Sequence, residues 1–95
     1  MSYDVPKLIK QPSESRLYTF DFAANMGASE SIVSVDSFTA APSGLTLGSA
    51  AISGKRVQNR ISGGTANTNY KITVVVTTDA GNTLEGEANL FVRDI

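Results

Sequence analysis

The stretch that decides the fold is residues 69–95, NYKITVVVTTDAGNTLEGEANLFVRDI. From Tyr70 onward, apolar side chains alternate with mostly polar ones, which is the period of a strand that buries one face. Asp79-Ala80-Gly81-Asn82 then favours a tight turn, because Gly tolerates positive φ and Asp and Asn can bond nearby backbone groups. A second alternating run, residues 83–93, follows the turn. The stretch therefore predicts a β-hairpin with one apolar face.

A hairpin alone is marginal in water, so residues 1–68 must supply a second layer. Runs with strand character occur at 16–22, 32–40, 45–52 and 56–62, separated by segments rich in Gly, Pro, Asn and Asp. The run 32–40 loses its phase between Val35 and Phe38, which predicts a bulge near Asp36-Ser37. About seven short strands at this spacing predict an all-β fold, a single immunoglobulin-like antiparallel β-sandwich. A small closed barrel is the alternative.

The first residues have a different character from the rest of the chain. Pro6 and Pro12 restrict any strand to residues 7–10, because proline cannot donate to a sheet ladder. We therefore divide the chain into residues 1–12, an N-terminal arm or edge strand, and residues 13–95, the sandwich. As an arm, residues 1–12 would become ordered on a neighbouring subunit. As an edge strand, they would pack within their own domain.

The inward phase of each predicted strand gives a predicted core. Its members are Tyr18, Phe20, Phe22, Ile32, Val57, Ile61, Ile72, Val74, Val76, Leu84, Leu90 and Val92. Asn59 shares this phase, and a buried amide needs hydrogen-bond partners. Tyr70 is either a structural tyrosine corner, whose hydroxyl bonds to upstream backbone, or an ordinary core aromatic.

The composition disfavours most kinds of active site. The chain has no His and no Cys, so it lacks the commonest general base, the commonest metal ligand and any thiolate. Gly63-Gly64-Thr65 lacks the Lys and the helix that follow a phosphate-binding loop, so we interpret it as a turn. We expect a protein that is not an enzyme, with no cofactor and no catalytic or metal-binding residues.

Charge and hydropathy bear on partners. Eight basic and nine acidic residues give a net charge of -1, and the two signs are interleaved, so we expect no nucleic-acid partner. No apolar run approaches the length of a membrane span, so we expect no membrane partner, and the first residues lack the features of a secretion signal. Asp79, Asn82, Glu85 and Glu87 lie around one turn and could bind a cation such as Ca²⁺, or the two glutamates could simply keep a strand edge soluble.

Several segments also carry a family resemblance. The hairpin segments YKITV, TDAGNTLEG and LFVRD, with the opening VPKLIKQP and RLYTFDF, resemble small virion proteins of tailed bacteriophages, of the fibre-tail adaptor type. The resemblance spans nearly the whole chain. It implies a non-enzymatic structural protein of the virion, made in the host bacterial cytoplasm, that contacts other virion proteins in a symmetric assembly of many copies. The part of the virion stays open between tail, fibre adaptor, head-tail connector and capsid decoration.

A different functional class is a carbohydrate- or surface-binding accessory module. Such modules display aromatic rings, but this chain has no Trp and most of its aromatics fall on inward faces, leaving Tyr3 and Phe91 exposed. We therefore prefer the structural role. Candidate interface residues are Tyr3, Pro6, Leu8, Ile9, Phe91 and Arg93, because aromatic and Arg side chains are common interface anchors and residues 1–12 are the candidate arm.

Overall fold

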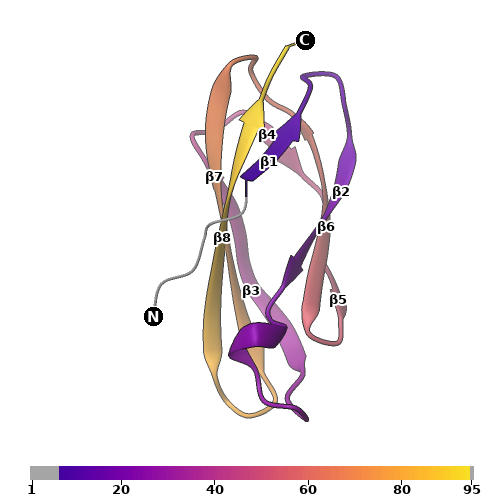
Figure 1. Cartoon of the computed structure of the whole chain (residues 1–95), viewed down its shortest axis with the longest axis vertical. Coiled ribbons are helices and arrows are strands. Elements are labelled where there is room, and N and C mark those ends of the chain that lie inside the picture. The colour runs from indigo at the N-terminus through magenta and orange to yellow at the C-terminus, as the bar shows by residue number, and fades with distance from the viewer. Residues whose placement is uncertain (1–6, 95) are drawn as a thin grey trace.

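The computed structural model describes residues 7–94, which form two stacked β-sheets (Figure 1). The first sheet has the order β1-β8-β7-β3, made of Lys7–Lys10, Thr83–Val92, Thr68–Thr78 and Ile32–Ala41. The second has the order β2-β6-β4, made of Arg16–Asp21, Arg56–Gly63 and Leu45–Leu47, and β5 (Ala51–Ser53) also pairs with β6. The only helical element described is a short 3₁₀ turn, η1 (Ala23–Asn25). The predicted all-β sandwich is confirmed, and its immunoglobulin-like character stays a prediction.

The predicted hairpin is β7 and β8, paired without a register shift from Thr68↔Val92 to Thr77↔Thr83. Its turn closes with two backbone hydrogen bonds, from Thr78 N–H to Asn82 C=O at 2.9 Å and from Gly81 N–H to Thr78 C=O at 3.0 Å. Gly81 has a φ of 82°, which only glycine adopts without strain. This is a three-residue loop with a bulge at its glycine, so the turn residues and the alternation together specified the hairpin.

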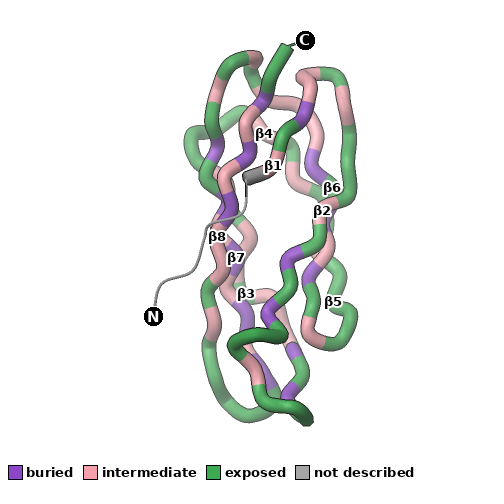
Figure 2. The backbone as a smooth tube through the Cα atoms, viewed as in Figure 1, coloured by how far each residue is buried: buried purple, intermediate pink, exposed green. Residues whose placement is uncertain are grey.

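The core lies between the two sheets (Figure 2). Ten of the predicted core residues are buried, while Tyr18 and Leu84 are half-buried and pack against the core. Tyr70 and Ala88 are also buried. The rings of Phe20 in β2 and Phe38 in β3 meet edge to face with centroids 5.4 Å apart, which ties one sheet to the other.

Strand β3 contains the predicted irregularity. Its register against β7 shifts between Val35 and Ser37, and it shifts a second time between Ile32 and Ser34. The alternation reports the first shift because Val35 and Phe38 both face inward. The second shift lies at the start of the strand, where too few residues precede it to show a change of phase.

The N-terminal strand belongs to its own sandwich. Strand β1 pairs in parallel with β8, from Lys7↔Asn89 to Lys10↔Val92, a position that agrees with the edge-strand alternative for residues 7–10. All the other pairings between the described strands are antiparallel, as expected. Lys10 is buried, and its Nζ donates to the carbonyls of Gln11, Pro12 and Glu14. Burial lowers the pKa of the Lys10 ammonium, and the nearby Glu14 opposes this shift.

The predicted run 45–52 is two short strands, β4 and β5, both alongside β6. Between them, Gly48 donates its backbone N–H to the Arg60 carbonyl of β6 at 2.8 Å, and a Cβ at Gly48 would be only 3.0 Å from Asn59 Oδ1. Asn59 itself is fully buried, and neither its Nδ2 nor its Oδ1 has a hydrogen-bond partner among the described residues. The amide that the sequence marked as needing partners therefore lies unpaired within the core.

Candidate functional site

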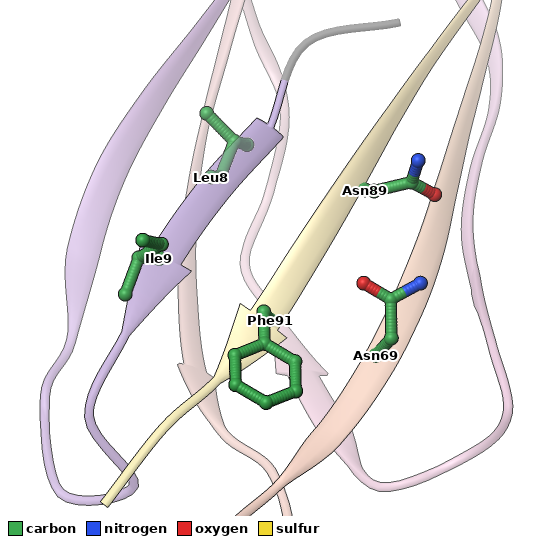
Figure 3. Close-up of a pocket in the computed structure, with 5 residues that line it drawn as sticks. All are labelled: Leu8, Ile9, Asn69, Asn89 and Phe91. Carbon is green, nitrogen blue, oxygen red and sulfur yellow. The ribbon is translucent and has the colours of Figure 1, made fainter. Parts of the chain in front are cut away.

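The outer face of the first sheet brings together two of the predicted interface residues, Ile9 and Phe91. The register places Ile9 of β1 and Asn69 of β7 on either side of Phe91 in β8. Leu90 and Val92 are buried, so Phe91 between them points to the outer face. Figure 3 shows Phe91 between Ile9 and Asn69. The parallel pairing of β1 is what brings Ile9 beside Phe91, although the two residues lie at opposite ends of the chain.

These side chains line a shallow depression of about 230 Å³, here called the Phe91 depression, whose five residues are Leu8, Ile9, Asn69, Asn89 and Phe91 (Figure 3). Ile9 is 54% exposed, so about half of this apolar side chain is in contact with solvent. Phe91 is half-buried, and Leu8 also packs against the core. None of the five carries an ionisable side chain, so the depression offers apolar contact and amide hydrogen bonds but no acid or base of its own.

Two residues of the depression, Asn69 and Asn89, were not among the predicted interface residues. Asn89 lies two positions before Phe91 on the same face of β8, so the alternation could have found it. Asn69 lies at the depression because the register of β7 against β8 places it opposite Phe91. Of the other predicted residues, Arg93 is exposed just after β8, and Tyr3 and Pro6 lie outside the described residues.

Tyr70 stands near the start of β7 with its ring buried. Its hydroxyl accepts a hydrogen bond from the backbone N–H of Thr65 at 2.8 Å. This bond lowers the pKa of the Tyr70 hydroxyl. The hydroxyl also lies close to Gly44, where a Cβ would be only 2.8 Å from it, so the tyrosine contacts both the β6–β7 connection and the turn before β4.

Three of the four residues considered for cation binding contact other groups of the protein. Asp79 accepts a hydrogen bond from the Ser31 N–H at 3.0 Å, and Glu87 forms an ion pair with Lys71 at 3.3 Å. Within residues 7–94, no group of three or more His, Cys, Asp or Glu side chains is placed to hold a metal ion. These contacts give Asp79 and Glu87 structural partners.

Asn82 belongs instead to a buried network around Glu30, which the sequence did not reveal. The Glu30 carboxylate accepts hydrogen bonds from Thr78 Oγ1, from Gly27 N–H at 2.9 Å and from Asn82 Nδ2 at 3.0 Å. The Thr78 bond, followed by the other two, lowers the pKa of Glu30. The network fastens the loop before β3 to the β7–β8 turn. It is a structural contact and lies on a different part of the sheet from the Phe91 depression.

Comparison with known proteins gives the family. No helix in the described part of the chain is long and apolar enough to cross a membrane. No individually curated protein is significantly similar in sequence. Residues 10–91 match the family described as podophage GP4 fiber-tail adaptor protein gp77, which covers β2 to β7 and nearly all of β8. The chain therefore belongs to this family of phage fibre-tail adaptors.

Proposed function

We propose that the chain is a structural protein of the virion that links tail and fibre components by direct protein contact, and that the Phe91 depression is one of its contact surfaces. The family supports the adaptor role and a place in the virion. The observation that carries the contact surface is the exposed Ile9 beside Phe91 on the outer sheet face. The proposed activity is binding, without catalysis.

The make-up of the depression suits a protein partner. Interfaces combine an apolar centre with a polar rim, and their centres are enriched in aromatic residues. Here Ile9 and Phe91 form the apolar centre, with the amides of Asn69 and Asn89 beside them. A stable interface buries roughly 800 Å² on each partner, so the contact would extend beyond the depression over the neighbouring outer face. Several copies in a symmetric assembly would each offer this surface once.

The test is Phe91→Ser, compared with Val33→Ser. Val33 is 56% exposed in β3, at the other edge of the same sheet, so it is a matched apolar control. Melting of the isolated chain should show that both variants keep the fold. The variants should then be supplied to phage that have no other copy of this protein. Particles should contain at least tenfold less of the Phe91→Ser chain than of the wild-type chain, and as much of the Val33→Ser chain as of the wild type.

Three results would count against this proposal. A folded Phe91→Ser chain that enters particles as well as the wild type would remove the depression as a contact surface. Unfolding of Phe91→Ser would assign Phe91 to the core. Micromolar and specific glycan binding that depends on Phe91 would favour the accessory module.

A further inference from the structure

Strand β8 is longer than β1, its neighbour at the edge of the sheet. It runs over Thr83–Val92, but β1 pairs only with its last part, from Asn89 to Val92. Figure 1 shows β1 beside the upper part of β8 only. Residues 83–88 therefore have β7 on one side and, within the part of the chain that the structure describes, no strand on the other. We name the side of residues 83–87 that faces away from β7 the open β8 edge.

The ladder shows which backbone groups this edge presents. Thr78 N–H donates to Asn82 C=O, and hydrogen-bonded pairs in an antiparallel ladder recur at every second residue, so Leu84 and Gly86 bond to β7. The N–H and C=O groups of Thr83, Glu85 and Glu87 then point away from β7. Arg93 belongs to the same alternation, and its N–H donates to Lys10 C=O of β1 at 2.8 Å. The open β8 edge therefore continues the row of backbone N–H and C=O groups that pair with β1 farther along β8.

An extension of β1 along this edge in the same register would lack one backbone hydrogen bond. The Arg93–Lys10 bond sets the parallel ladder, and stepping back along it assigns the N–H of residue 6 to the carbonyl of Glu87. Residue 6 is proline, which has no N–H. The carbonyl of Glu87 would stay without a donor in such an extension.

The open β8 edge is also regular, unlike the opposite edge of the sheet. Strand β3 has two register shifts, and bulges of this kind discourage pairing with another chain. The pairing of β8 with β7 has none over its whole length. A straight edge with unpaired backbone groups is a template for an added strand.

We propose that the open β8 edge binds an extended segment of another virion protein by strand addition, a segment in which basic and apolar side chains alternate. This rests on the proposed adaptor function and adds a second contact to it. On the outer face the added strand meets Glu85, which is exposed, and Glu87, whose side chain is 28% exposed. Glu87 is already paired with Lys71 at 3.3 Å, so the charge that a basic side chain of the segment complements is chiefly that of Glu85. Two copies meeting at this edge would place acidic side chains together, which disfavours self-pairing.

The other face of the added strand meets apolar surface. Leu84 is half-buried there, and Gly86 lies against Phe22 so closely that a Cβ would be 2.9 Å from its ring. An apolar side chain from the segment would extend this contact between Leu84 and Phe22. Backbone hydrogen bonds would then supply the affinity, and side-chain contacts on the two faces would determine which segments bind.

The probe is the heptapeptide Lys-Val-Lys-Val-Lys-Val-Lys with capped ends, added to the full chain. The amide signals of Thr83, Glu85 and Glu87 should shift by NMR, and their hydrogen exchange should slow by at least tenfold at saturation. The matched peptide with Glu in place of Lys should bind at least tenfold more weakly. Glu85→Lys should reverse this preference, while Asp94→Lys, an equal charge change beyond the end of β8, should leave it within about twofold.

Each other outcome overturns strand addition by a basic segment. Equal binding of both peptides, or shifts outside residues 83–88, would show non-specific association. Self-association of the chain through the same amides would assign the edge to a second copy. Failure of the peptide to bind would remove this contact and leave the Phe91 depression untouched, because that surface is tested by incorporation of Phe91→Ser into particles.

Discussion

Thr65 donates its backbone N–H to the hydroxyl of Tyr70 across 2.8 Å. The bond spans the connection between β6 and β7, the link that carries the chain from one sheet to the other. It therefore fixes the connection through which the chain passes from one layer to the other. We propose that Tyr70 acts as a structural tyrosine corner.

Replacing Tyr70 with Phe should remove this hydrogen bond and keep the ring. The loss of one buried hydrogen bond should lower the free energy of unfolding by about 1 kcal/mol, measured by urea denaturation. Tyr18→Phe is the matched control, because the Tyr18 hydroxyl reaches only Ile9 C=O, at an exposed position and a distance of 3.4 Å. Equal stabilities for Tyr70→Phe and the wild type would reduce Tyr70 to an ordinary core aromatic.

The buried amide of Asn59 predicts a stabilising substitution. Asn59→Leu keeps the same branching of heavy atoms and removes two polar atoms that are buried without a partner in the described residues, so it should raise the free energy of unfolding by about 1–2 kcal/mol. Asn59→Ala is the comparison, because it removes the same polar atoms but leaves a cavity and should gain less. A destabilised Asn59→Leu would mean that the amide is hydrogen-bonded in solution.

The Glu30 network predicts a specific acid sensitivity. Because its pKa is lowered from the usual 4.5, the Glu30 carboxylate contributes stability above pH 4.5, and this contribution is lost as the pH falls through the folded-state pKa. At pH 7, Glu30→Gln should therefore melt at a lower temperature than the wild type. This difference in melting temperature should shrink as the pH falls through the folded-state pKa of Glu30. Glu85 is an exposed carboxylate on β8, so Glu85→Gln should melt like the wild type both at pH 7 and in acid. A Glu30→Gln chain that melts like the wild type under both conditions would contradict the network.

The sequence was most informative where structure is local. The β7–β8 hairpin follows from alternation and from a turn whose Gly81 supplies the positive φ. The bulge after Val35 follows from a break in phase. These features depend on residues that are neighbours in the chain, so their pattern survives in the sequence.

Contacts between distant segments could not be predicted. Glu30 and Thr78 are 48 residues apart, and nothing near either one indicates that the loop before β3 meets the hairpin turn. Lys10 is buried because its Nζ finds three backbone carbonyls nearby, although a lysine at a strand end is usually exposed. The Phe91 depression likewise depends on the parallel register of β1 against β8.

The central claim is that the Phe91 depression contacts another virion protein, and photo-crosslinking inside assembled particles tests it most directly. A photoreactive amino acid would replace Ile9, which is exposed at the depression, and in a parallel sample Val33, which is exposed on β3. If the chain with the substitution at Ile9 is not incorporated, Asn69 carries the crosslinker instead. We expect crosslinks to a tail or fibre protein from the depression and few from Val33. Particles that contain the substituted chain but give no crosslink from the depression would contradict the claim.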